Sequence, residues 1–282
     1  MTNCMYQDSV SDLIQTALRE DLGTGDITTL SVIEKDREAH GRLIAKEDGV
    51  LCGLELISDV YAALDEEVRV VYHAEEGTHV HRSDLVAEVF GPARSLLSGE
   101  RVALNLVQHL SGIATATAKA ASAVEGTKAR ITDTRKTTPG MRVLEKYAVR
   151  VGGGSNHRFC LADGILIKDN HIVAAGGITA AVQSARKNAP HTLKIEVEVE
   201  SRDQAQEALD AGADIIMLDN MSCPEMKACV DMIAGRAVVE ASGNMGERDL
   251  REVAETGVDI ISIGALTHSV KAMDISMKFT LL

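Results

Sequence analysis

Ionisable and small polar residues lie at the ends of six short apolar, β-branched runs in the second half of the sequence: they directly follow five of the runs and alternate along the end of the third. They are Asp133 to Thr138, Lys168 to His171, the alternating Glu196, Glu198 and Glu200, Asp219-Asn220, Glu240 to Asn244, and Gly264 to His268. If the runs are parallel strands of a barrel, their carboxyl ends open at one mouth, where active sites of such barrels lie. One such group is most simply an ordinary polar loop. Six in succession favour an active site.

The cations of these groups come early in the chain. Arg135, Lys136, Arg158 and Lys168 fall within 34 residues. Arg binds carboxylate or phosphate through paired hydrogen bonds, and Lys acts as a compact charge. The pattern therefore predicts a multiply anionic substrate. The triple glycine 152–154 could bring backbone amides to an anion, or it could be a flexible loop.

The carboxylates lie in the middle groups of the six. Glu196, Glu198 and Glu200 alternate, so on a strand all three share one face. Carboxylates on the inner face of a barrel need cations, so we expect one or two of them to reach the mouth and meet Lys, Arg or a metal. A solvated acidic edge strand is the alternative. Glu198 and Asp219 are the types of ligand that Mg²⁺ prefers.

Small residues end the last two runs. Ser242-Gly243-Asn244 and Ser262-Ile263-Gly264 occupy the position at which barrels often bind phosphate through backbone amides. His157, His171 and His268 lie near the strand ends, where each could also be a structural hydrogen-bonding residue. His73, His79 and His81 lie in turn-like sequence that has no metal-binding spacing.

These groups have to be held by regular elements. The runs are 130–132, 164–167, 193–199, 215–218, 237–239 and 260–263, and helical stretches follow most of them. Such alternation predicts a parallel sheet with crossover helices. We expect a barrel, with an open doubly wound sheet as the alternative.

Residues 1–125 have a different pattern, which predicts an α+β region. Apolar spacing indicates a helix that ends at Gly23 and another around 57–64, with strands at 41–52 and 68–72. Residues 93–124 are rich in Ala and Leu and should form one or two helices, broken near Gly112.

Composition narrows the class of protein. The formal net charge of -13 argues against a nucleic-acid or acidic-membrane binder. The five cysteines form no CxxC pair, which is typical of reduced thiols in the cytoplasm. No signal peptide or membrane-spanning run is evident.

Several motifs together resemble one family, quinolinate phosphoribosyltransferase, over nearly the whole chain. They are 20–28 (EDLGTGDIT), 98–105 (SGERVALN), 134–140 (TRKTTPG), 152–158 (GGGSNHR), 166–171 (LIKDNH), 217–220 (MLDN), 240–244 (EASGN) and 262–268 (SIGALTH). Asn244 stands where many members have a second glycine.

The resemblance implies an N-terminal α/β sandwich domain (1–125) and an open α/β barrel (126–268), with the tail 269–282 packing on the former. It implies a cytoplasmic homodimer, or a higher oligomer, in which Arg101 completes the neighbouring subunit's site. The implied reaction converts quinolinate and phosphoribosyl pyrophosphate, with Mg²⁺, to nicotinate mononucleotide, pyrophosphate and CO₂.

The resemblance also assigns roles to residues. Quinolinate would be held by Arg101, Thr134, Arg135, Lys136, His157, Arg158 and Lys168. Glu198 and Asp219 would hold the ribose hydroxyls and the Mg-pyrophosphate. Ser242, Gly243, Asn244, Ser262, Ile263 and Gly264 would take the 5′-phosphate, with His268 nearby. Lys136 or Lys168 would supply the final proton.

Two other functions fit part of the pattern. A paralogous group linked to molybdate transport, or a nicotinate phosphoribosyltransferase, would keep the fold and change the substrate. A non-catalytic small-molecule binder would keep the pocket without turnover, although Lys136, Glu198 and Asp219 favour an enzyme.

Overall fold

The computed structural model describes residues 4–282, and the side chains of residues 8–282, as two compact units. Unit 1 comprises residues up to 118 together with 138–153 and 270–282. Unit 2 comprises residues 119–137 and 154–269. The division differs from the predicted boundary at residue 125, because segment 138–153, which we expected in the barrel, packs with unit 1.

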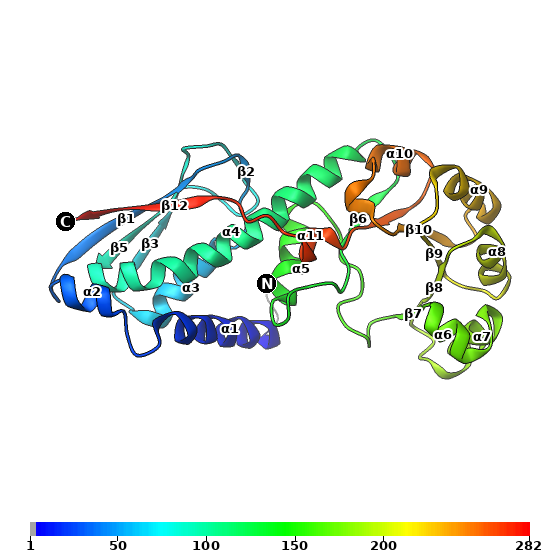
Figure 1. The fold of residues 1–282 in the computed structure, drawn as a ribbon, viewed down its shortest axis with the longest axis horizontal. Coiled ribbons are helices and arrows are strands. Elements are labelled where there is room, and N and C mark those ends of the chain that lie inside the picture. The colour runs from blue at the N-terminus through cyan, green and yellow to red at the C-terminus, as the bar shows by residue number, and fades with distance from the viewer. Residues whose placement is uncertain (1–3) are drawn as a thin grey trace. The chain divides into compact units, whose positions relative to one another are not determined.

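Unit 1 is built on a four-stranded antiparallel sheet in the order β12-β1-β5-β3 (Figure 1). Its strands are β1 (Glu38–Ala45), β3 (Arg69–Tyr72), β5 (Leu85–Pro92) and β12 (Ile275–Leu281), and β2 (Gly49–Val50) pairs with β4 (His79–Val80). Every second residue of β1 is buried, which is the period of a strand with one face in the core.

The helices of unit 1 include those that the apolar stripes and the Ala- and Leu-rich stretch predicted. They are α1 (Cys4–Leu22), α2 (Ile27–Val32), α3 (Glu55–Leu64), most of α4 (Ala93–Ala123), and α5 (Arg142–Val151). Ile14 and Leu18 of α1 and Ile57, Val60 and Tyr61 of α3 are buried in the core. The predicted helices at 10–22 and 57–64 are thus confirmed.

The predicted break near Gly112 is wrong, because α4 runs through it as one helix of 31 residues. A Cβ at Gly112 would collide with the carbonyl group of Lys271, in the segment that leads to β12. The glycine allows this close approach and does not end the helix.

Gly152, the first residue of the triple glycine 152–154, also allows a close approach between two segments. A Cβ at Gly152 would collide with the carbonyl oxygen of Ala114 and lie 2.7 Å from Cβ of Thr117, both on α4. Leu144, Ala148 and Val149 of α5 are buried as well. Close packing against α4 explains why segment 138–153 belongs to unit 1.

Unit 2 is a six-stranded parallel sheet in the order β6-β11-β10-β9-β8-β7. Its strands are β6 (Arg130–Thr132), β7 (Ile165–Ile167), β8 (Ile195–Val199), β9 (Ile215–Asp219), β10 (Val238–Ser242) and β11 (Ile260–Ser262). Each strand after β7 pairs with its predecessor, and β11 returns to β6. Sequential order is typical of a barrel, but the two edge strands, β6 and β7, do not pair with each other, so the barrel is open as predicted.

Helices follow the strands in chain order, and four of them, those after β7, β8 and β9, lie along one side of the sheet in Figure 1. They are α6 (Asp169–Ala175), α7 (Ile178–Asn188), α8 (Arg202–Asp210), α9 (Cys223–Ile233), α10 (Leu250–Glu255) and the short α11 (Ala265–His268), with a 3₁₀ turn η1 (Met245–Glu247). Ser201 and Ser222 cap α8 and α9 by accepting hydrogen bonds from the amides of Gln204 and Glu225. Among the described residues, no helix has the length and apolar character needed to cross a membrane.

Candidate active site

A cavity of about 730 Å³ lies in unit 2 at the carboxyl ends of the strands. Its lining includes Thr134, Arg135, Lys136, His157, Arg158, Lys168, Glu198, Asp219, Ser242, Gly243, Asn244, Ser262, Gly264 and His268. Two predicted site residues do not line it. Arg101 is exposed on α4 in unit 1, and Ile263 is 2% exposed, with its amide donating to the carbonyl of Thr132 at 2.9 Å.

One wall of the cavity is strongly cationic. Arg158 donates from Nη1 to the carbonyl oxygen of Gly164 at 3.0 Å. Burial and the positive charge of Arg135 lower the pKa of Arg158. The lowered pKa indicates that the positive charges of Arg158 and Arg135 lie close together and are partly desolvated. An anionic ligand is bound most strongly under this condition.

One of the alternating glutamates meets a lysine, as predicted, and a second meets a histidine. Glu198 forms an ion pair with Lys168, and Oε2 of Glu196 lies 3.2 Å from Nε2 of His157. Glu200 lies beyond the end of β8 and is exposed. The inner face of the strand therefore carries two paired carboxylates, and the acidic-edge alternative is wrong.

Asp219 ends β9 at the same side of the cavity. Its Oδ2 accepts a hydrogen bond from Nδ2 of Asn220 at 2.7 Å. Asn220 has a positive φ of 54°, a conformation that Asn tolerates better than most residues. This turn leaves the Asp219 carboxylate half-buried beside the cavity.

The loops after β10 and β11 require their glycines. Gly243 has a φ of 89°, and a Cβ there would lie 2.6 Å from the backbone nitrogen of Asn220. A Cβ at Gly264 would lie 3.0 Å from Cδ of Lys136 and 3.2 Å from Nε2 of His268. The two glycines therefore let three segments converge at this end of the cavity.

The other predicted histidines have partners. Nδ1 of His171 accepts the backbone amide of Lys168 at 3.0 Å, which caps α6. Nδ1 of His268 lies 2.7 Å from Oγ of Ser269. His73 lies 2.7 Å from a carboxylate oxygen of Glu88, on the sheet of unit 1.

Two buried residues were not assigned a role from the sequence. Asp133 is fully buried, and its carboxylate accepts hydrogen bonds from the amide of His157 at 2.8 Å and from Nδ2 of Asn156 at 2.6 Å. Glu240 is 1% exposed and lines the cavity. Both directly follow apolar runs, a position that could have indicated them.

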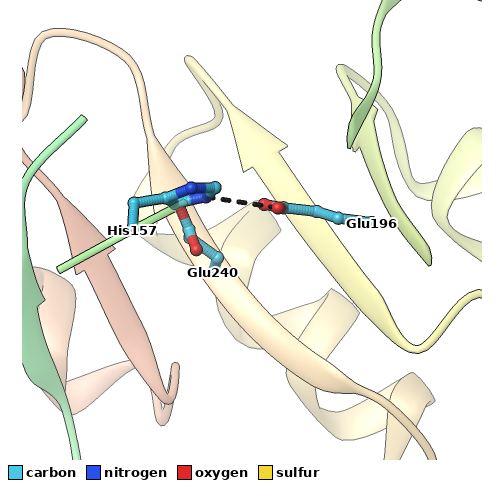
Figure 2. Close-up of side chains that lie close together, drawn as sticks. All are labelled: His157, Glu196 and Glu240. Atoms are coloured by element: carbon cyan, nitrogen blue, oxygen red, sulfur yellow. Dashed lines mark ion pairs between the residues drawn. The ribbon is translucent and has the colours of Figure 1, made fainter. Parts of the chain in front are cut away.

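The buried Glu240 and Glu196 and the half-buried His157 form a cluster (Figure 2). Oε1 of Glu240 lies 3.7 Å from Nε2 of His157. Burial, together with the charge of Glu196, raises the pKa of Glu240 to about 7. Burial lowers the pKa of His157, but the hydrogen bond and charge of Glu196 and the charge of Glu240 outweigh it, so that pKa lies above its ordinary value.

Comparison with known proteins identifies the family. Residues 26–111 match the quinolinate phosphoribosyl transferase N-terminal domain, and residues 113–278 match the C-terminal domain. A Bacillus subtilis protein named probable nicotinate-nucleotide pyrophosphorylase (carboxylating) is 48% identical over 93% of this chain and 90% of its own length. The Mycobacterium leprae nicotinate-nucleotide pyrophosphorylase (carboxylating) is 42% identical over 98% of this chain and 99% of its own.

Solved structures agree. A NadC deletion mutant has a TM-score of 0.95 at 45% identity, covering 100% of this chain and 99% of its own. NadC from Streptococcus pyogenes has a TM-score of 0.92 at 46% identity, covering 97% of this chain and 98% of its own. The matches in sequence and in fold extend over nearly the whole chain and agree with one another. The chain belongs to the quinolinate phosphoribosyl transferase family.

Proposed function

We propose that this protein transfers the phosphoribosyl group of phosphoribosyl pyrophosphate to quinolinate and decarboxylates the product to nicotinate mononucleotide. One structural observation supports this reaction for a member of the family. A single cavity joins a cationic wall, two strand-end carboxylates and a glycine-containing turn, in the chain order Arg135, Glu198, Gly243. These parts match a dicarboxylate, a pyrophosphate-bearing ribose and a 5′-phosphate respectively.

Quinolinate would lie against the cationic wall. Arg135 and Arg158 offer planar guanidinium groups to its two carboxylates, and Lys136 and Lys168 add charge. The lowered pKa of Arg158 supports this placement, because a bound dianion would relieve the repulsion between the two arginines. Thr134 holds the loop by accepting the amide of Lys136 at its Oγ1, at 3.1 Å.

The 5′-phosphate would lie at the turn after β10 and β11. Ser242, Gly243, Asn244, Ser262 and Gly264 offer hydroxyl groups and backbone amides without bulky side chains in the way. Ile263 would act through its packing and backbone, since its side chain is buried. His268, exposed beside Gly264, would approach the phosphates.

Glu198 and Asp219 fit a role in holding Mg²⁺. Both line the cavity at neighbouring strand ends, and carboxylate and phosphate oxygens are the donors that Mg²⁺ selects. Because Glu198 is already paired with Lys168, the ion would be held chiefly through the pyrophosphate, with water completing its shell. When bound, the ion neutralises charge on the departing pyrophosphate.

The chemistry then follows from charge placement. As the C1–pyrophosphate bond breaks, the ribose becomes oxocarbenium-like, and the carboxylate of Glu198 stabilises that positive charge. The ring nitrogen of quinolinate attacks C1 and becomes positively charged. The adjacent C–CO₂⁻ bond then breaks, its electron pair stays on the carbon beside N⁺, and a proton from Lys136 or Lys168 is added there. Most of the protein's contribution is positioning.

We also propose that the protein is a cytoplasmic homodimer in which Arg101 of one protomer completes the partner's quinolinate site. The exposure of Arg101 on α4 supports this assignment. Stability of the dimer in dilute solution would be measured by analytical ultracentrifugation.

The proposed reaction is tested by incubating the purified protein with Mg²⁺, phosphoribosyl pyrophosphate and quinolinate labelled in its 2-carboxylate. We expect equimolar release of labelled CO₂ and pyrophosphate. Pyrophosphate released with nicotinate but not with quinolinate would indicate the nicotinate-specific alternative. Quinolinate binding without release of either product would indicate a non-catalytic binder.

A further inference from the structure

The cluster of His157, Glu196 and Glu240 borders the cavity, whose lining includes His157 and Glu240, and it has no part in the mechanism above. Its members come from the loop before β7, from β8 and from β10, and Figure 2 shows the imidazole ring pointing at the Glu196 carboxylate. Among the described residues, Oε1 of each glutamate is buried and has no hydrogen-bond partner. A buried pair of carboxylates is costly, so its presence calls for a role.

The two ring nitrogens of His157 are engaged in opposite ways. Nδ1 accepts the backbone N–H of Arg158 at 2.8 Å. Nε2 lies 3.2 Å from Oε2 of Glu196, a carboxylate, which can only accept unless it is protonated. The ring therefore carries its hydrogen on Nε2 and a lone pair on Nδ1. The negative charges of Glu196 and Glu240 favour a second proton on the ring. A proton on Nδ1 would, however, face the Arg158 N–H, so the hydrogen bond at Nδ1 keeps the ring singly protonated.

The same geometry weighs against a metal ion in the cluster. One ligand atom from each of the three residues lies within 4.8 Å of the others, which is close enough for an ion. A metal at Nε2 would need the lone pair of that nitrogen, and the ring hydrogen would then move to Nδ1. Nδ1 is already an acceptor. The cluster is therefore better explained by hydrogen bonding within the protein.

We propose, on the basis of the proposed function, that Glu196, with Glu240 behind it, is a positioning residue that fixes the tautomer of His157 and thereby places Arg158 for quinolinate. His157 then acts as an internal support for Arg158 and not as a ligand of the substrate. Glu196 fixes the hydrogen on Nε2. The freed lone pair at Nδ1 anchors the Arg158 amide, and the Arg158 guanidinium is fixed further by the carbonyl of Gly164.

The placement matters because Arg158 binds through a planar group. Its two parallel hydrogen bonds to a carboxylate need a defined orientation, and a positional error of about 1 Å can cost a large part of such an interaction. A ring free to change tautomer or rotate would release the Arg158 backbone. Asp133 supports the same loop from the other side through the His157 amide.

The first test reads the tautomer directly. The protein contains nine histidines, so ¹⁵N-histidine labelling with His157→Gln for assignment isolates the signal of His157. We expect Nε2 to be protonated and Nδ1 unprotonated, both before and after saturation with quinolinate. A hydrogen on Nδ1, or a second proton gained when quinolinate binds, would overturn the proposal and make His157 a ligand of the substrate. Mn²⁺ bound in a 1:1 ratio without substrates, and lost in Glu196→Gln, would overturn it in favour of a metal site.

The second test uses a matched pair on one strand. Glu196→Gln keeps the shape but not the fixed acceptor, because an amide can present either oxygen or N–H. We expect about a tenfold rise in KM for quinolinate, equal to the loss of one hydrogen bond, with kcat and the KM for phosphoribosyl pyrophosphate within about twofold. Glu200→Gln, at the exposed third position of the alternation, should leave all three unchanged.

Different results would contradict the proposed function and the positioning role of Glu196. If the unaltered protein releases no CO₂ from quinolinate, the proposed function is wrong. If it does, and Glu196→Gln behaves like Glu200→Gln, the positioning role is wrong. If Glu196→Gln does not fold, the labelled spectrum of the unaltered protein decides the question by itself.

Discussion

Replacing Glu240 with Gln should remove a specific pH dependence from the stability of the protein. Burial, and then the charge of Glu196, raise the pKa of Glu240 from 4.5 to about 7, whereas His157, Ser262 and Lys168 oppose that rise. Below pH 4.5 the folded and unfolded states both hold the proton. Between pH 4.5 and about 7 only the folded state keeps it, so stability falls as the pH rises and levels off above about 7.

The size of the change in stability follows from the interval between the two pKa values of Glu240. Each pH unit between the two pKa values corresponds to about 1.4 kcal/mol, which gives a loss of about 3 kcal/mol between pH 4.5 and about 7. Gln is neutral throughout, so Glu240→Gln lacks this component. Because other groups titrate in the same range, the informative quantity is the difference in unfolding free energy between the unaltered protein and the variant at each pH.

The assay is urea unfolding, followed by circular dichroism, at half-unit steps from pH 4.5 to 8. Relative to the unaltered protein, Glu240→Gln should gain stability steadily up to about pH 7 and then hold it. The exposed Glu200→Gln serves as the control and should run parallel to the unaltered protein. Parallel curves for Glu240→Gln and the unaltered protein would refute the argument, because they would mean that Glu240 is ionised in the folded state as readily as in the unfolded chain.

Three further predictions follow from the site. Arg135→Ala and Arg158→Ala should each weaken quinolinate binding by about 1.5–3 kcal/mol and largely spare phosphoribosyl pyrophosphate binding; calorimetry that shows the reverse pattern would overturn our division of the cavity. Gly243→Ala should raise the KM for phosphoribosyl pyrophosphate and cost about 1–3 kcal/mol of stability, because φ is 89° and the new Cβ meets the turn after β9; thermal unfolding and kinetics measure both, and an unaltered KM would count against the phosphate site. Mixing inactive Arg101→Ala and Lys136→Ala proteins should restore partial activity through hybrid dimers, whereas no recovery after subunit exchange would argue against a shared site.

Much of unit 2 could be predicted because its signals are local. The β-branched runs define strands, and parallel pairing brings their ends together whatever the details of the loops. The alternation of Glu196 and Glu198 predicted paired carboxylates on one face. In the structure Glu198 forms an ion pair with Lys168, and Oε2 of Glu196 lies 3.2 Å from Nε2 of His157.

The features that the sequence did not reveal depend on contacts between distant segments. The neighbours of Glu240 come from β8 and from the loop at His157, segments that lie more than 40 residues earlier in the chain. The glycine at 112 looked like a helix terminator, because an isolated helix disfavours glycine. Only the position of Lys271, far along the chain, reveals that the small residue serves close packing.

The pairing of β12 with β1 has a consequence for the order in which the chain can fold. In unit 1, β1 is an interior strand only when β12 lies beside it. At about 5–20 residues per second, a ribosome needs about 10–45 s to add the roughly 230 residues between Ala45 and Ile275. During that time one edge of β1 remains open, and open edges are sites at which nascent chains pair with one another. Residues 275–281 therefore complete a sheet whose first strand is made some 230 residues earlier, and any nascent chain that stops before Ile275 leaves that edge exposed.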